Sequence, residues 1–334
     1  MTAEMHGRPA ALPARGGWVA AHWQTWRPYT TCYPALLGLA GALVAGGRDA
    51  AGLVVAALVP ALGWLAGHYL GDYFDRDLDA IAKPQRPIPS GRLAPTTAVA
   101  CGVGCAVVSL VAALAVNWRI LPVFALAMGG IVAYSTVFKR RGLAGNLSRG
   151  ALSALALVVG AMTAAPWPPW AIVPAAVVFL LHDTASNLIG TMRDVDGDRA
   201  GGYRSVPVRH GLVVAMRLAA ALWAAGTVVV GLGAVHAARP GAQLGLLAVA
   251  AVVGGCALAA VRPGAATARR ALRSHELLVA ERLVLAGAVV AGAVGLGPAV
   301  ALLVPALAFS IVMQARMRAR HEFPATAGDG EDTP

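Results

Sequence analysis

Residues 72–79 read DYFDRDLD, so four carboxylates stand close together in a chain that has only 16 acidic residues among 334. Residues three, four and seven apart share one face of a helix, which places Asp72, Asp75 and Asp79 in one stripe. Stacked carboxylates repel one another unless a cation lies between them. Hard oxygen ligands without a nearby His or Cys suit Mg²⁺. For this cluster alone, a solvated helix end paired with Arg76 is the simpler interpretation, and a magnesium site is favoured only because a second such cluster follows.

A second acidic cluster, RDVDGDR, carries Asp194, Asp196 and Asp198. Its aspartates repeat those of the first cluster at a constant offset of 119 residues (198 − 79). An arginine, a proline and a glycine then follow each cluster in the same order. We interpret the two segments as pseudo-repeats, with Asp194 and Asp198 forming the second metal-binding stripe.

Basic residues accompany both clusters. Mg²⁺ held by few carboxylates usually bridges to substrate phosphates, and guanidinium groups bind phosphate oxygens strongly. The sequence contains no glycine-rich loop of the kind that binds nucleotides. The pattern therefore predicts a metal–diphosphate site. The candidate diphosphate-binding residues are Lys83, Arg86, Lys139, Arg140, Arg193 and Arg204.

The elements that must position these residues are apolar and long. The chain is 58% hydrophobic and 13% charged, and its mean hydropathy is +0.66. Several runs have the length that crosses a bilayer and lack the polar face of a soluble helix. We predict an all-α, polytopic transmembrane bundle of nine to ten helices, with each Asp-rich motif at a cytoplasmic helix end. The predicted spans are 31–47, 50–71, 94–116, 120–137, 146–165, 170–190, 211–235, 243–261, 277–296 and 298–315.

The 27 basic residues are distributed unevenly over the predicted loops. Loops that would share a side with the N-terminus hold nearly all of them, and the other side holds only Arg48, Arg119 and Arg239. By the positive-inside rule, the N-terminus and both acidic clusters face the cytoplasm. We predict a multi-pass protein of the cytoplasmic membrane, surrounded by lipid, with no nucleic-acid partner despite its net charge of +11. The expected boundaries are a polar tail at 1–22, one transmembrane domain at 23–318 and a polar tail at 319–334.

A diphosphate at the mouth of a membrane bundle implies a lipid-like tail below it, which an isoprenoid diphosphate provides. Cationic groups would stabilise the departing diphosphate, and the allylic cation left behind needs a dry site with aromatic faces. Ionisable residues inside membrane helices are candidates for function, although helix packing explains each of them alone. The candidate prenyl and acceptor pocket residues are His68, Tyr73, Tyr134, His182, Asp183 and Asn187.

Three stretches together resemble the UbiA superfamily of intramembrane prenyltransferases: GDYFDRDLDAIAKPQRPIPSGRL, YSTVFKRRGLAGN and RDVDGDRAGGYRSVPVRHG. The resemblance covers roughly residues 20–235. It implies Mg²⁺-dependent transfer of a prenyl group from a prenyl diphosphate to an aromatic or lipid acceptor, with two or more Mg²⁺ ions. By motif matching, the metal-binding and catalytic residues are Asp72, Asp75, Asp79, Asp194 and Asp198, and the diphosphate contacts include Lys83, Arg86, Lys139 and Arg140.

The sequence departs from the family pattern at two glycines. Gly71 stands where the first motif usually has Asn, and Gly190 stands four residues before Asp194, so neither side chain can bind metal or phosphate. The main alternative is therefore a terpene cyclase of the same superfamily, which would turn farnesyl or geranylgeranyl diphosphate into a cyclic terpene without an acceptor. A transporter is a further alternative, but transporter sites usually lie near the bilayer midplane. The transferase is the function that we expect.

Overall fold

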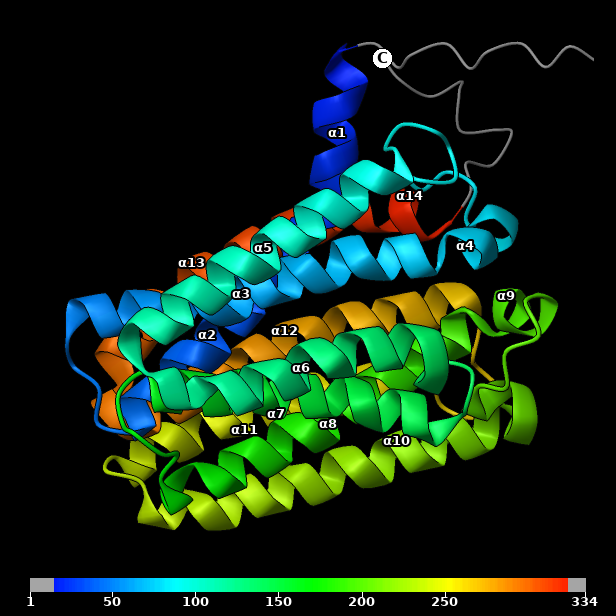
Figure 1. Cartoon of the computed structure of the whole chain (residues 1–334). Coiled ribbons are helices and arrows are strands. Elements are labelled where there is room, and N and C mark those ends of the chain that lie inside the picture. The colour runs from blue at the N-terminus through cyan, green and yellow to red at the C-terminus, as the bar shows by residue number, and fades with distance from the viewer. Residues whose placement is uncertain (1–14, 324–334) are drawn as a thin grey trace, which may run out of the picture.

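The structure is a computed structural model, which describes residues 15–323. Every regular element in this range is helical (Figure 1). The long helices are α2 (Pro28–Val44), α3 (Ala50–Phe74), α5 (Pro95–Val116), α6 (Leu121–Ala133), α7 (Leu143–Met162), α8 (Val173–Arg193), α10 (Val206–Gly233), α11 (Pro240–Ala260), α12 (Ala268–Val294) and α13 (Leu296–Met313). The shorter helices are α1 (Arg15–Trp26), α4 (Arg76–Ala82), α9 (Val195–Ala200) and α14 (Ala319–Glu322), with 3₁₀ turns at Trp118–Ile120, Trp170–Ile172 and Ala234–His236 and π turns at Tyr134–Phe138 and Gln314–Arg318.

Nine helical segments within residues 15–323 are long and apolar enough to cross a membrane. They correspond to nine of the ten predicted spans, and the tenth is α2, which has 17 residues. At 1.5 Å per residue α2 is about 26 Å long, near the lower limit for a span. It packs against α3, α7 and α12. The predicted all-α bundle of nine to ten helices is confirmed.

One helix begins earlier than its hydropathy predicted. Helix α12 begins at Ala268, nine residues before the predicted start. The prediction from hydropathy missed its first turns because they carry Arg269, Arg270 and Arg273. The Thr267 side chain caps this end by accepting a hydrogen bond from the Arg270 backbone N–H at 3.2 Å. Helix α10 has a kink at Gly211 (φ 80°, ψ 167°), so its uninterrupted part begins at the predicted position and a separate helical turn from Val206 precedes it. Hydropathy locates the apolar part of a helix and leaves out its polar ends.

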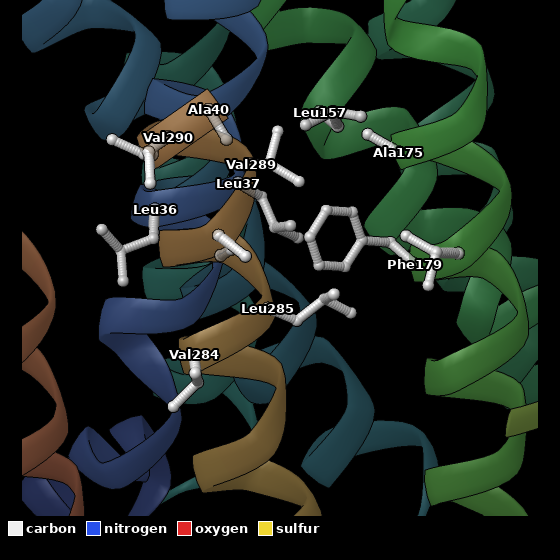
Figure 2. Close-up of a cluster of buried hydrophobic side chains, with 14 of the residues drawn as sticks. Leu36, Leu37, Ala40, Leu157, Ala175, Phe179, Val284, Leu285, Val289 and Val290 are labelled. Carbon is white, nitrogen blue, oxygen red and sulfur yellow. The ribbon is translucent and has the colours of Figure 1, made fainter. Parts of the chain in front are cut away.

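Helix α12 is the central element of the bundle. In its most apolar window 78% of the residues are buried, against 17% for the following helix α13. Figure 2 shows Leu285 and Val289 of α12 in one cluster with Leu37 of α2 and Phe179 of α8. Because lipid is as apolar as these side chains, such packing stabilises the bundle through close contact rather than through exclusion of water.

Glycines let α2 approach its neighbours at backbone distance. A Cβ on Gly38 would lie 1.7 Å from the Ala56 carbonyl oxygen of α3, and one on Gly160 of α7 would lie 2.1 Å from the Gly38 oxygen. Small residues at helix contacts are the usual means of close packing in membranes. Helix α2 is therefore fixed between α3 and α7 by contacts that no larger residue permits.

The two acidic clusters lie at the same end of the bundle. Helix α3 gives way to α4 at Asp75, and α8 gives way to α9 at Asp194. The short helices α4 and α9 contact each other, and Figure 1 shows them together at one end.

Parts of the predicted tails are helical. Helix α1 begins at Arg15, within the predicted tail 1–22, and α14 lies within the predicted tail 319–334. The rest of these tails, residues 1–14 and 324–334, lies outside the described residues. The expected domain boundaries therefore stay a prediction.

Candidate active site

One cavity of about 590 Å³ lies among α2, α3, α4, α6, α7, α8, α9, α12 and α14. Both aspartate stripes line it, together with lysine and arginine side chains from seven different parts of the chain. Thirteen predicted site residues are brought together here: Asp72, Asp75, Asp79, Asp194, Asp198, Lys83, Arg86, Lys139, Arg193, His68, Tyr134, Asp183 and Asn187. Their shared location agrees with the prediction, while their chemical roles stay predictions.

The first stripe keeps a helical path across the α3–α4 break. The backbone N–H of Asp75 donates to the Gly71 carbonyl at 2.8 Å, and that of Asp79 donates to the Asp75 carbonyl at 2.8 Å. The i, i+4 spacing is therefore preserved, and Asp72, Asp75 and Asp79 are all buried on the cavity side. Asp77, which lies off this stripe, has an 88% exposed side chain.

The second stripe has the same backbone pattern. The N–H of Asp194 donates to the Gly190 carbonyl at 3.2 Å, and that of Asp198 donates to the Asp194 carbonyl at 2.8 Å. Gly71 and Gly190 thus occupy equivalent positions, each four residues before the aspartate at the break. A Cβ added at Gly71 would have open space around it.

Cations neutralise most of these carboxylates. Lys139 pairs with Asp75 at 2.7 Å, Arg86 with Asp79 at 2.8 Å, and Arg27 with Asp72. Asp194 pairs with Arg193 at 2.6 Å and with Lys83 at 3.0 Å. At the mouth of the cavity, Asp72, Asp75, Asp79 and Asp194 thus each pair with at least one basic side chain.

The donor set at the mouth fits Mg²⁺ that is shared with a phosphate ligand. Asp72 Oδ2 and Asp75 Oδ1 are buried and have no hydrogen-bond partner in the described part of the chain. No group of three or more His, Cys, Asp or Glu within residues 15–323 is already gathered around one ion position. Mg²⁺ typically takes only one or two carboxylates and completes its shell with water and substrate phosphates. Two free carboxylate oxygens meet that requirement.

Burial and neighbouring charges separate the two aspartates of the second stripe. Burial, followed by the nearby Asp194 charge, raises the pKa of Asp198 to about 6. Burial alone would also raise the pKa of Asp194, but the charges of Arg193 and Lys83 lower it overall. Asp194 is therefore ionised at neutral pH, whereas Asp198 changes its protonation state about one pH unit below neutral.

Glu322 of α14 is a site residue that the sequence did not reveal. Its carboxylate accepts from Lys83 at 2.7 Å, pairs with Arg193 at 3.0 Å and with Arg86 at 3.3 Å. Its neighbour His321 accepts from Arg27 Nε at 3.0 Å. Three cations predicted to bind diphosphate are thus already in contact with an internal carboxylate.

Two predicted phosphate-binding residues lie outside the cavity. Arg140 is exposed, and its guanidinium lies 5.0 Å from the centre of the Tyr203 ring. Arg204 is exposed too, and its backbone N–H donates to the Arg140 carbonyl at 3.3 Å. The chain turns outward here, so adjacency to Lys139 in sequence does not bring Arg140 to the site.

Two predicted pocket residues also lie elsewhere. Tyr73 faces away from the stripe, and Arg76 stacks over its ring at 4.5 Å. His182 is buried among helices, where Nδ1 lies 2.8 Å from Glu281 and Nε2 lies 3.0 Å from the Trp223 carbonyl. Both residues serve packing, which the sequence had left as the alternative.

The interior of the cavity is apolar at its far end. Side chains of α3, α6 and α7 line it there, including Val59, Phe124, Met128, Leu152 and Val159. A polar layer lies between this lining and the aspartates, formed by His68, Trp64, Asn146, Arg149 and Asn187. Arg149 and Asn146 were not predicted as site residues. The sequence could have indicated them, because both are polar residues within an otherwise apolar predicted span.

Comparisons with known proteins agree with this architecture. Residues 31–271, more than half of the chain, match the model of the UbiA prenyltransferase family. The chain is 35% identical to the digeranylgeranylglyceryl phosphate synthase of Methanopyrus kandleri, over 58% of this chain and 70% of that one. It spans between 57% and 70% of the length of the archaeal relatives with that name.

Two solved structures have the same fold. The UbiA homologue from Aeropyrum pernix K1 has a TM-score of 0.68 at 19% identity, covering 77% of this chain and 96% of that one. The Archaeoglobus fulgidus homologue, bound to DMAPP and Mg²⁺, has a TM-score of 0.57 at 15% identity, covering 88% and 99%. Fold and family model together define the class, an intramembrane prenyltransferase. The chain belongs to the UbiA prenyltransferase family, so the predicted family and enzyme class are confirmed.

Proposed function

We propose that this chain transfers a prenyl group from a prenyl diphosphate to a phosphorylated, lipid-like alcohol, in a reaction that requires Mg²⁺. One observation carries the proposal: two aspartate stripes and their cations line the mouth of a cavity whose far end is apolar. This polarity gradient matches a prenyl diphosphate, with its charged head at the mouth and its chain inside.

The diphosphate would lie among Lys83, Arg86, Lys139 and Arg193, with Mg²⁺ held by the free oxygens of Asp72 and Asp75 and by the second stripe. When bound, Mg²⁺ supplies positive charge against the developing negative charge of the leaving group. Lys83, Arg86 and Arg193 are held beside the mouth by Glu322, so the diphosphate would exchange with this carboxylate on binding, and the cations would then be in place as charge develops.

In the proposed reaction, the bond between C1 of the prenyl chain and the diphosphate oxygen breaks, and the diphosphate keeps the electron pair. The acceptor hydroxyl oxygen forms a new C–O bond to C1, and its proton passes to the departing diphosphate. The apolar interior excludes water, which would otherwise capture the allylic cation.

The names of the relatives support a phosphorylated acceptor. The Methanopyrus kandleri relative is named for the product digeranylgeranylglyceryl phosphate, which carries two prenyl chains and a phosphate on glycerol. We therefore favour a glycerol-based lipid phosphate over the aromatic acceptor that the sequence left open. The acidic end of the bundle is proposed to face the cytoplasm, because the basic loops surround it.

A product assay on the protein in lipid nanodiscs tests the proposal. Geranylgeranyl diphosphate and Mg²⁺ would be supplied with geranylgeranylglyceryl phosphate, with 4-hydroxybenzoate, or with no acceptor. We expect a prenylated lipid phosphate only in the first mixture, identified by mass spectrometry. A cyclic terpene in the third mixture would establish the cyclase instead, and product only in the second would establish an aromatic acceptor.

A further inference from the structure

The cations that line the cavity can be sorted by their partners. Arg318 donates hydrogen bonds to Gln314 and His275, both at 2.6 Å. Within residues 15–323, Arg149 alone among these cations has neither an ion pair nor a side-chain hydrogen bond. Six other cations each pair with a carboxylate: Arg27, Lys83, Arg86, Lys139, Arg193 and Arg282.

Aromatic packing fixes the position of Arg149 without neutralising it. Its guanidinium lies 4.0 Å from the centre of the Trp64 ring, and Trp64 Nε1–H donates to Thr30 Oγ1 at 3.1 Å. A guanidinium has five N–H donors, and a charge inside a membrane bundle is costly unless it is paired. The structure thus holds a rigid, unpaired cation against the cavity.

A second unmet polar group lies one helical turn away. Asn146 precedes Arg149 by three residues on α7, so the two share a helix face. Asn146 donates to Asn187 Oδ1 at 2.7 Å, but its own Oδ1 is buried without a hydrogen-bond partner in the described residues. Buried carbonyl oxygens are rarely left without a donor. Arg149 can therefore bind an anionic group, and Asn146 Oδ1 can accept a hydrogen bond from a hydroxyl group.

Arg149 is separate from the diphosphate cations, and Asn146 lies between it and the mouth, in the first turn of α7. Trp64, whose ring stacks against Arg149, precedes Asp72 on α3 by eight residues, or about 12 Å along the helix. Arg149 thus lies deeper than the mouth and beside the path of the prenyl chain. An acceptor at this depth would have its hydroxyl close to the reacting carbon, with its anionic group held apart from the diphosphate.

We propose that Arg149 and Asn146 form the acceptor subsite, in which Arg149 binds the phosphate monoester of the acceptor and Asn146 accepts a hydrogen bond from its hydroxyl group. Guanidinium binds phosphate through two parallel hydrogen bonds, which fixes orientation as well as charge. This inference rests on the proposed function and assigns the residues that select its acceptor.

Steady-state kinetics of Arg149→Gln with two acceptors test the inference. The acceptors are geranylgeranylglyceryl phosphate and the same lipid alcohol without phosphate. We expect the substitution to raise the KM for the phosphorylated acceptor by about tenfold to 100-fold, since a lost hydrogen bond to a charged group has that effect. The KM for geranylgeranyl diphosphate and the kinetics with the neutral acceptor should stay within about twofold. Arg149→Lys should restore part of the loss.

The matched control is Arg119→Gln, because Arg119 also stacks on a tryptophan, Trp118, but at the opposite end of the bundle. An equal loss with both acceptors, or a raised KM for the diphosphate, would overturn the assignment. Direct binding of the phosphorylated acceptor, measured by calorimetry on nanodiscs with Mg²⁺ and pyrophosphate present, separates this inference from the proposed function. If the wild-type protein forms no product but binds this lipid through Arg149, the function fails and the subsite stands.

Discussion

At the scale of single residues, Asp75 and Asp77 form a natural control pair. Asp75 is buried and bonded to Lys139, whereas Asp77 is exposed on the other side of the same turn. We expect Asp75→Asn to lower kcat/KM at least about 100-fold, since one preorganised electrostatic group contributes that much. Asp77→Asn should stay within about twofold. Mg²⁺-dependent pyrophosphate release measures both, and equal losses would remove the role assigned to the stripe.

Asp198 gives the site a defined pH dependence. Its pKa is raised to about 6, so it is ionised above this pH and protonated below it. A protonated carboxyl is a poor ligand, and we expect Mg²⁺ affinity of the substrate-free protein to fall as the pH drops through about 6. Titration calorimetry across that range should show the step, and Asp198→Asn should abolish it. The free energy of unfolding changes in the opposite direction. Because the pKa of Asp198 is higher in the folded protein than its ordinary value of 3.8, protonation stabilises the fold as the pH falls from about 6 towards 3.8.

The aspartate stripes could be predicted because their geometry is local. Positions 72, 75 and 79 share a helix face whatever surrounds them, and the structure keeps that face intact. Arg140 and Tyr73 could not be excluded in the same way. Their direction depends on where the chain turns after α6 and α3, which periodicity within a segment does not specify.

At the scale of helices, Gly160 tests the close approach of α2 and α7. A side chain there would collide with the Gly38 backbone, so Gly160→Leu must push the helices apart. Overpacking of this kind costs about 1–3 kcal/mol, and we expect a lower thermal midpoint and weaker activity. Gly104→Leu is the control, since a Cβ at Gly104 meets nothing within 4 Å. The same midpoint for both variants would contradict the packing argument.

Helix α14 places Glu322 among cations that a diphosphate would also bind. Substrate must therefore compete with an internal anion for Lys83, Arg86 and Arg193. We expect Glu322→Gln to bind pyrophosphate about three- to tenfold more tightly, because the competing charge is removed. Glu276→Gln is the control, since Glu276 pairs with the exposed Arg273. Calorimetry with Mg²⁺-pyrophosphate decides, and unchanged or weaker binding to Glu322→Gln would show that the two anions do not compete.

The sequence could not predict the contact between Lys83 and Glu322. These residues are 239 positions apart, and they meet only because α13 returns the chain to the mouth of the cavity. Arg149 illustrates the same difficulty. Its polarity was visible, but its lack of a partner became evident only when every neighbouring helix was in place.

At the scale of the whole molecule, the uneven distribution of basic residues predicts orientation. In a variant without native cysteines, we expect Asp196→Cys to react from the cytoplasmic side and Trp170→Cys from the other side. Both side chains are exposed and lie at opposite ends of the bundle. Membrane-impermeant thiol reagents applied to intact cells and to inverted vesicles measure this. The reverse pattern would contradict the positive-inside assignment.

The central place of α12 has a consequence for biosynthesis. This helix spans Ala268–Val294, so it leaves the ribosome after most of its neighbours, yet it fills the middle of the bundle. Glu281 and Arg282 on α12 are the partners of His182 and Asp183 on α8. Until the last fifth of the chain is inserted, those two groups lack their partners and the earlier helices enclose a vacant centre. Newly made protein must therefore stay loosely assembled until synthesis is nearly complete.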